Sequence, residues 1–347
     1  MKRTVVRSRA SNPLTLLCLF CVGALAGQVS TACQETTRVQ APEFAPHPRQ
    51  LQLPLITVVA PEAAPVLPLL RTLRSELTPD FDVQVISLRR ATTTAELASL
   101  LAIQAPRALV LVDNSAGQLY APIARAAKHP LPSVLVMSSF VERLQQSVPN
   151  STAIGFETPA VTTLSDVRSV LSRPIARAGV VYRKGFEGFV THERELAQRE
   201  QIELVALSVP AEPSVANLSR ALRHLEHEHI DAVWISNDNV LLSKKLLGNA
   251  WVPFAKKTAL PIVVGVPALV ETAVPFGTYA AVPDTEGLGV QTADLLYALQ
   301  KQEWLWSSTA VHPPIAVKTY LNVARARELG APLEGQKRVD VLFEGNL

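Results

Sequence analysis

Four consecutive polar side chains, Ser236 to Asn239, follow a run of buried-strand character in the second half of the chain. A helix start needs only one capping side chain, so capping by itself accounts for one of the four. The carboxylate of Asp238 could accept hydrogen bonds from an ammonium group, and the amides of Asn237 and Asn239 both donate and accept. These residue types predict a contact site for a zwitterionic or polar small molecule, with simple capping as the alternative.

Other polar and aromatic groups stand at comparable places, directly after apolar runs. Arg183 could clamp a carboxylate with two hydrogen bonds, and Phe186 or Tyr182 could stack on a flat group. A solvated turn with a buried aromatic residue explains the same stretch equally well. The remaining candidate ligand-binding residues, also at the ends of apolar runs, are Asp113, Asn114, Ser115, Ser138, Ser139 and Asp284.

Sequence signatures of catalysis are absent. The chain has no G-x-S-x-G, no P-loop, no dinucleotide fingerprint and no H-E-x-x-H. His224, His227 and Glu228 are spaced to share one helical face. Because structural zinc sites need four ligands and no second cluster is present, we expect no metal site. We therefore expect a binding protein without a cofactor.

Ten short β-rich runs alternate with helical patterns along the chain. Runs that are apolar throughout suit parallel strands covered by helices on both faces. Repeated strand–helix units predict open, doubly wound sheets with right-handed crossovers. Helices are predicted at residues 94–104, 163–172, 189–200 and 215–229, and strands at 53–60, 81–88, 107–113, 132–138, 152–156, 176–182, 202–209, 231–236, 261–266 and 277–282.

The ten strands divide into two sets of five at Ser172–Pro174, which predicts two lobes joined by about three crossings. We expect a first lobe of residues 51–170 plus 286–303, and a second of 174–283 plus 312–347. Ligands of such sheets bind beyond the carboxyl ends of the strands, so the polar loops should face a cleft between the lobes. In this interpretation Ser236 or Asn237 caps a helix that begins near Val240, and Asp238 stays solvated until a ligand binds.

The N-terminus has the pattern of a secretory signal. Four basic residues precede an apolar run, Pro13–Gly27, that is too short to span a membrane stably. Cleavage could follow Ala24–Ala26, an A-x-A site. Alternatively, Ser30–Cys33 resembles a bacterial lipobox, and Cys33 would then be lipidated. We expect residues 1–33 to be a leader to the periplasm and residues 34–50, which are polar and rich in proline, to be a tether.

Charge excludes one class of partner. The whole chain has a formal net charge of +3, and removal of the four basic residues of the leader leaves −1. Nucleic-acid binding needs a basic face, so we expect no such partner.

Several segments of the second half resemble a known family. DAVWISNDNVLLSKKL matches a strand that ends in an Asp-Asn turn, and ALPIVVG matches the strand after it. AAVPDTEGLGVQTADLLYALQK matches a helix start with Asp284 and Gly289 in register, and AVKTYLNVARARELGAP matches a closing strand and helix with Asn322 and Gly330. RPIARAGVVYRKGFEGFVTHERELAQREQIELVALSV resembles the opening of the second lobe. The family is that of ABC-transporter substrate-binding proteins whose known members bind aromatic amino acids.

The resemblance implies an α/β protein of two Rossmann-like lobes with a ligand cleft between them, the type I periplasmic binding protein fold. It implies an extracytoplasmic protein that captures a small polar or amino-acid-like solute for an ABC permease in the inner membrane. Membrane contact would come only through the lipid anchor. Thr285 stands where the family has a tyrosine, which predicts a different ligand preference. A receptor that signals to a membrane sensor is the alternative, and no nucleophile–base pair supports an enzyme.

Overall fold

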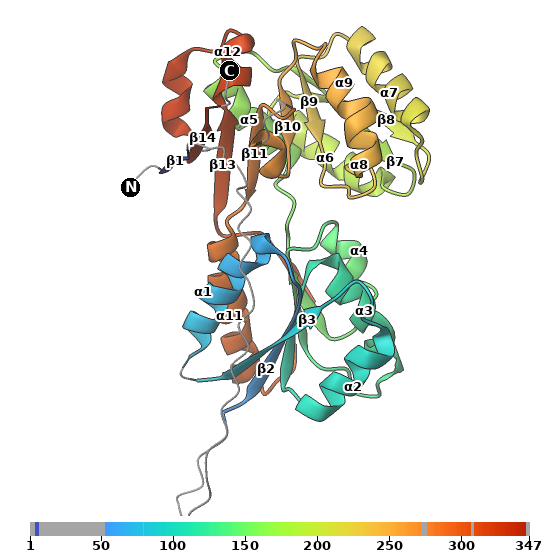
Figure 1. The fold of residues 1–347 in the computed structure, drawn as a ribbon, viewed down its shortest axis with the longest axis vertical. Helices are drawn as coiled ribbons and strands as arrows, with labels where there is room; N and C mark the ends of the chain where they lie inside the picture. The colour runs from blue at the N-terminus through green and yellow to red at the C-terminus, as the bar shows by residue number, and fades with distance from the viewer. Residues whose placement is uncertain (1–3, 7–52, 79, 272–275, 307–308, 345–347) are drawn as a thin grey trace, which may run out of the picture. The chain divides into compact units, whose positions relative to one another are not determined.

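The computed structural model describes residues 4–6, 53–78, 80–271, 276–306 and 309–344. They form two sheets, each with its own helices (Figure 1). The smaller sheet has six strands in the order β12-β6-β5-β4-β2-β3, and the larger has eight in the order β1-β14-β13-β11-β10-β9-β7-β8. Among the described strands only β11 and β13 pair antiparallel. The predicted fold class, two doubly wound α/β lobes, is confirmed.

All ten predicted strands form, within a few residues of their predicted ends. In the smaller sheet they are β2 (Leu55–Pro61), β3 (Asp82–Leu88), β4 (Ala108–Val112), β5 (Ser133–Val136) and β6 (Ser151–Ile154), which β12 (Val311–His312) joins. In the larger sheet they are β7 (Arg177–Arg183), β8 (Glu203–Val209), β9 (Ala232–Ile235), β10 (Ile262–Val264) and β11 (Tyr279–Pro283), which β13 (Val317–Asn322), β14 (Val341–Phe343) and β1 (Thr4–Val6) join.

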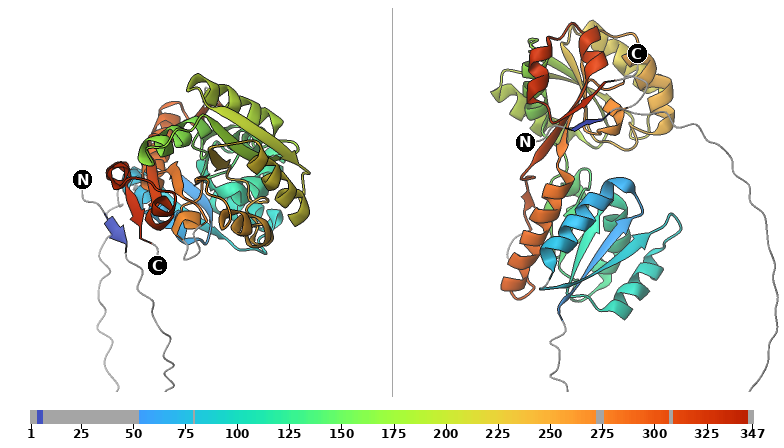
Figure 2. Two further views of the ribbon diagram at one scale, coloured as in Figure 1. Left: turned by 90° about the horizontal axis from the view of Figure 1, so that it is seen from above. Right: turned by 60° about the vertical axis from the view of Figure 1, so that its left-hand side comes forward.

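Helices cover both faces of the smaller sheet, as its uniformly apolar strands require. On one face α1 and α11 lie side by side, as Figure 1 and the right-hand view of Figure 2 show, and pack on Val58 and Val110. On the other face α2, α3 and α4 pack on Val59 and Leu111. The helices of this lobe are η1 (Ala64–Val66), α1 (Leu67–Leu77), α2 (Thr94–Gln104), α3 (Asp113–Ala126), α4 (Val141–Gln145) and α11 (Thr285–Lys301).

The larger sheet is covered in the same way. One core contains Val180 and Trp234 against α5 and α6, and the other contains Val233 and Ile235 against α7 and the fully buried Trp251. The helices of this lobe are α5 (Ala160–Val170), α6 (Glu187–Arg199), α7 (Val215–His227), α8 (Lys244–Leu246), a π-helical turn η2 (Leu247–Trp251), α9 (Val252–Ala255), α10 (Ala268–Glu271), α12 (Val323–Glu328) and η3 (Leu333–Arg338).

Within the described residues the chain passes from one sheet to the other three times, after β6, after β11 and after β12. The first passage lies earlier than we expected. Ala160, Leu164 and Val167 of α5 are buried in a core of the larger sheet, so α5 belongs to the second lobe, not to the first. Because β12 pairs with β6, His312 belongs to the first lobe. The apolar stripe of α5 suits either lobe, and packing decides between them.

Of the predicted leader, only Thr4–Val6 is described. It forms β1, which pairs parallel with β14 at the edge of the larger sheet, although we expected no leader residue in the fold. Cleavage at either predicted site would remove β1 and leave β14 as the edge strand. Cys33, the two cleavage sites and the tether lie outside the described residues. Within the described part of the chain, no helix is both long enough and apolar enough to cross a membrane.

Gly289 sets how closely α11 approaches α1. A Cβ atom at this position would lie 2.8 Å from Cβ of Thr72 and 3.1 Å from the carbonyl oxygen of Leu69. Gly289→Ala should therefore lower the free energy of unfolding by about 1–3 kcal/mol, because the helices must move apart. Gly188→Ala in α6 is the control: its Cβ meets nothing within 4 Å, and alanine should stabilise that helix by about 0.5–1 kcal/mol. Urea denaturation of both variants measures the difference, and equal effects would contradict the prediction.

Candidate functional site

A hollow of about 560 Å³ lies where the loops after β4 and β5 meet the loops after β7 and β9. These loops all leave the carboxyl ends of parallel strands, and β7 and β9 are the pair between which the strand order of the larger sheet reverses. Open α/β sheets bind ligands at such points. The lining residues of this interlobe pocket are Asn114, Gln118, Ser139, Phe140, Arg143, Leu144, Ser147, Arg183, Lys184, Gly185, Phe186, Ala211, Asn237, Asp238, Asn239 and Val240.

The pocket brings together seven of the residues predicted from the sequence: Asn114, Ser139, Arg183, Phe186, Asn237, Asp238 and Asn239. The sequence reading missed several others that line it. Lys184 is the neighbour of Arg183, and Gln118 lies one helical turn after Asn114. Phe140 and Arg143 follow Ser139 directly into α4. Proximity to a predicted loop could have identified all four, but their side-chain types alone gave no signal.

Asn114 fixes the two loops of the first lobe to each other. Its Nδ2 donates to the carbonyl oxygen of Ser139 at 2.8 Å, and its Oδ1 accepts from the backbone nitrogen of Ser139 at 2.9 Å. Three non-glycine residues nearby have left-handed backbones: Asp113 (φ 72°), Met137 (φ 56°) and Phe140 (φ 51°). Each such conformation costs of order 1–3 kcal/mol, and such residues cluster at functional sites.

The other predicted residues do not line the pocket. Asp113 turns back on its own helix, where its Oδ1 accepts from the backbone nitrogen of Ser115 at 2.9 Å. Ser138 is completely buried, and its hydroxyl has no hydrogen-bond partner among the described residues. Asp284 caps α11, accepting from the backbone nitrogen of Gly287 at 3.2 Å. Asp113 and Asp284 therefore bond to their own helices, and Ser138 lies in the interior of the first lobe.

Arg183 and Asp238 form an ion pair between the ends of β7 and β9. Nε of Arg183 donates to Oδ2 of Asp238 at 2.7 Å, and their side chains are 16% and 3% exposed. Arg183 also donates through Nη1 to the carbonyl oxygen of Ala211 at 2.9 Å. The pair exists because β7 and β9 are neighbours in the sheet, which places their carboxyl ends side by side.

This arrangement corrects our expectation for Asp238. Its Oδ1 accepts from the backbone nitrogens of Val240 and Leu241 at 2.9 and 3.2 Å, so Asp238 itself holds the turn that follows β9. The residue is 2% exposed and not solvated. The helix that follows begins at Lys244, not near Val240. Of this loop Asn239 is exposed, whereas Ser236 and Asn237 are buried.

Phe186 joins the two lobes at the pocket. Its ring lies 4.5 Å from the ring of Phe140 in the first lobe, measured between centroids. The guanidinium carbons of Arg143 and Arg183 lie 4.6 and 4.8 Å from its centroid, within the range of cation–π attraction. Phe140 also packs edge-on against Phe189 at 5.0 Å. The ring of Phe186 thus contacts one guanidinium group from each lobe.

Two carboxyl groups, the half-buried Glu157 and the buried Glu193, lie at the first passage between the sheets. Glu157 accepts from the backbone nitrogen of Phe140 at 2.6 Å, and burial raises its pKa to about 7, with repulsion from Glu142 adding to the rise. Glu193 accepts from the backbone nitrogen of Ala160 at 2.6 Å, and burial raises its pKa as well. Each carboxyl group therefore accepts a hydrogen bond from the backbone near this passage, and burial disfavours its ionised form.

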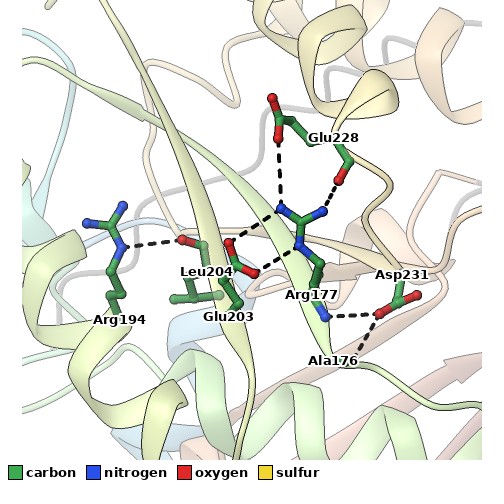
Figure 3. Close-up of polar contacts among 7 residues, drawn as sticks. All are labelled: Ala176, Arg177, Arg194, Glu203, Leu204, Glu228 and Asp231. Carbon is green, nitrogen blue, oxygen red and sulfur yellow. Dashed lines mark hydrogen bonds and ion pairs between the residues drawn. The ribbon is translucent and has the colours of Figure 1, made fainter.

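A second hollow, of about 710 Å³, lies at the opposite end of the larger sheet, where β7 and β8 begin. Its charged side chains already have partners there or close by (Figure 3): Arg177 donates to Glu203 at 2.9 Å and to the carbonyl oxygen of Glu228, and the neighbouring Asp231 accepts from the backbone of β7. Arg194 donates to the carbonyl oxygen of Leu204 at 3.3 Å. Because these groups already have partners, we assign the hollow a structural role.

The histidine-rich end of α7 holds no metal-ligand constellation. Nε2 of His224 lies 3.2 Å from Oε1 of Glu228, four residues further on. In the described part of the chain, no group of three or more His, Cys, Asp or Glu side chains is arranged to hold a metal ion.

No protein-family model matches the sequence, and a search of curated proteins gave no match. Solved structures do match. The ABC domain from Streptococcus pneumonia in complex with L-Trp is 17% identical, with a TM-score of 0.59 over 84% of this chain and 100% of that one. A ligand-free, open substrate binding protein with adhesive properties from Clostridium difficile is 13% identical, with a TM-score of 0.63 over 84% and 99%. A conserved domain protein from Vibrio cholerae is 18% identical, with a TM-score of 0.57 over 84% and 100%.

These identities are low, so the likeness concerns the fold. It agrees with the two doubly wound lobes. The chain therefore has the fold of the type I periplasmic substrate-binding proteins of ABC transporters.

Proposed function

We propose that this protein captures a small solute in the interlobe pocket outside the inner membrane and delivers it to an ABC permease. One observation supports this most strongly: loops from both sheets line the same pocket. A ligand there contacts both lobes, so binding favours the arrangement in which the lobes are close together.

The lining chemistry suits binding. Amides, hydroxyls, cations and two phenylalanine rings surround the hollow, and neither a histidine nor a cysteine is among the described residues that line it. A few convergent polar groups of this kind fix the orientation of a small ligand. The solved neighbours support the same role, since one contains L-Trp and another is named a substrate binding protein. The predicted leader supports an extracytoplasmic location, and a possible lipid anchor at Cys33 supports attachment to a membrane surface.

A thermal-shift screen over amino acids, nucleosides and small organic acids tests the proposal. A solute at 100 times its dissociation constant should add about 2.7 kcal/mol to the stability of the folded protein. Asn239→Ala should weaken binding of the solute about 3- to 10-fold, the effect of one lost hydrogen bond, and leave the melting temperature without ligand unchanged. Asn239 lines the pocket, so its loss should lower the affinity for the solute, and it is exposed, so its loss should not lower the stability of the unliganded protein.

Asn249→Ala is the matched control, because Asn249 is also exposed but lies outside the pocket on η2. Equal effects of the two variants on affinity would place the ligand elsewhere and contradict the proposal. Neighbouring genes then distinguish delivery from signalling: a permease and ATPase pair indicates transport, and a sensor kinase indicates a receptor.

A further inference from the structure

The interlobe pocket has an excess of positive charge. Three cationic side chains line it, Arg143 from α4 and Arg183 and Lys184 from the end of β7, against one carboxylate, that of Asp238. Arg143 belongs to the first lobe and the other two belong to the second. What matters for a ligand is which of these charges already has a partner.

Arg183 and Asp238 neutralise each other. Oδ2 of Asp238 accepts from Nε of Arg183 at 2.7 Å, and its Oδ1 accepts from the backbone nitrogens of Val240 and Leu241. Oδ1 thus accepts two hydrogen bonds and Oδ2 accepts one, and the side chain of Asp238 is only 3% exposed. Among the described residues that line the pocket, Asp238 is the one carboxylate, and because its charge is already paired with Arg183 it is a poor partner for the ammonium group of a zwitterionic ligand.

The positive charges of Arg143 and Lys184 are not neutralised in this way by any described residue. Among the described residues, no carboxylate lies within ion-pair distance of either side chain. Arg143 donates through Nη1 to the carbonyl oxygen of Gly185 at 3.2 Å and rests on the ring of Phe186. The nearby carboxylate of Glu187 accepts instead from the backbone nitrogen of Gly185 at 2.8 Å.

The ring of Phe186 holds the cations of the two lobes near each other. Arg143 and Arg183 both lie within 5 Å of its centroid, at 4.6 and 4.8 Å. Because Asp238 already neutralises Arg183, Arg143 and Lys184 are the cations of the pocket whose charge an anionic ligand could balance. Arg143 retains unused N–H donors in a planar fork, which is the geometry that carboxylate and phosphate oxygens accept best.

We infer that the solute carries a net negative charge, and that Arg143 of the first lobe and Lys184 of the second bind its carboxylate or phosphate group. Asn237 and Asn239 complete the pocket around the remainder of the molecule. The inference rests on the proposed function, since it specifies the class of solute that the same pocket takes. It disfavours solutes whose only charge is an ammonium group.

Paired probes test the charge of the solute. Each anion is compared with its uncharged analogue in a thermal-shift assay: benzoate with benzamide, succinate with succinamide, and glycerol 3-phosphate with glycerol. L-Tryptophan serves as the zwitterion. At least one anion should raise the melting temperature while its analogue does not, and added salt should weaken the effect because exposed charges are screened. Which anion binds distinguishes a carboxylate from a phosphate ligand.

Charge-removing variants test the two residues. Arg143→Gln and Lys184→Gln should each weaken binding of the anion that shifts the wild-type protein by about 10- to 100-fold, the effect of a lost charge-assisted hydrogen bond. Lys128→Gln is the control: Lys128 is exposed in the first lobe, has no ion pair among the described residues, and does not line the pocket. It should bind the anion as the wild type does.

The failures of the two proposals are distinguishable. If L-tryptophan or an uncharged analogue binds and Asn239→Ala weakens it, the pocket is a solute site but the inference is wrong. If no anion at millimolar concentration shifts the melting temperature, or if Lys128→Gln matches the effect of Arg143→Gln, the inference is also wrong. If a solute binds and no pocket variant changes its affinity, the proposed function fails as well.

Discussion

Asp238→Ala should lower the free energy of unfolding by about 3 kcal/mol in the absence of any ligand. Removing one member of a buried ion pair leaves the other charge without compensation, which typically costs about 3–5 kcal/mol. The lower end applies because the side chain of Arg183 is 16% exposed. The backbone nitrogens of Val240 and Leu241 would also lose their acceptor.

Asp284→Ala is the matched control for this prediction. Asp284 is also an aspartate that accepts a backbone hydrogen bond just after a buried strand, here as the cap of α11, but it makes no ion pair among the described residues. Its replacement should cost about 1 kcal/mol, the usual effect of a lost cap. Urea denaturation of both variants measures the difference. If Asp238→Ala is no more destabilising than Asp284→Ala, the ion pair does not stabilise the fold.

A double-mutant cycle separates the contribution of the ion pair from that of the hydrogen bonds that Asp238 accepts from the backbone. Asp238→Asn retains an oxygen for the two backbone nitrogens and removes the charge. Combined with Arg183→Met, it should show a coupling energy of at least about 1 kcal/mol, because the residues are in direct contact. Additive effects would mean that Arg183 contributes through its contacts with Ala211 and Phe186 alone.

Glu157→Gln should stabilise the protein at alkaline pH and have little effect under acid conditions. Burial raises the pKa of Glu157 to about 7 from its ordinary value of 4.5. Between these values the folded protein binds more protons than the unfolded chain, so stability falls as pH rises from about 4.5 to 7 and is level above that. A shift of this size is worth at most about 3 kcal/mol, which Glu157→Gln should recover at pH 8.

Unfolding free energies at pH 5, 6, 7 and 8 test this prediction. The amide oxygen that Glu157→Gln introduces can still accept from the backbone nitrogen of Phe140, so the contact that holds the passage is retained. Glu286→Gln makes the same change of charge at an exposed position of α11 and should follow the wild type. Burial also raises the pKa of Glu193, so part of the pH dependence should persist in Glu157→Gln. A variant less stable than the wild type at pH 8 would contradict the prediction.

Local pattern was sufficient for ten of the strands, but it did not predict β1, β12 or β14. Uniformly apolar runs such as β4 and β9 are buried on both faces of their sheets, and all ten predicted strands formed within a few residues of their predicted ends. The helix at residues 94–104 also begins and ends where we predicted it, since its capping box, Thr93 with Glu96, depends on residues three apart. The polar loops that line the pocket follow from the same rule, because carboxyl ends of parallel strands gather at one edge.

Three features of the protein could be established only from the tertiary structure. α5 carries an apolar stripe that could cover either sheet, and only packing assigns it to the second lobe. Phe140 and Arg143 reach the pocket because α4 brings them against Gly185 and Phe186, more than 40 residues further on.

The third feature is the environment of Asp238. Its sequence neighbours predict a solvated residue beside a helix start, yet the order of the larger sheet places β9 next to β7 and thereby Asp238 against Arg183. The sequence alone determined that polar groups follow several of the strands, including β4, β5, β7 and β9, because that depends on neighbours along the chain. Strand order decided which of these groups bond to each other and which remain free for a ligand, because charge pairing acts through space between residues 55 positions apart.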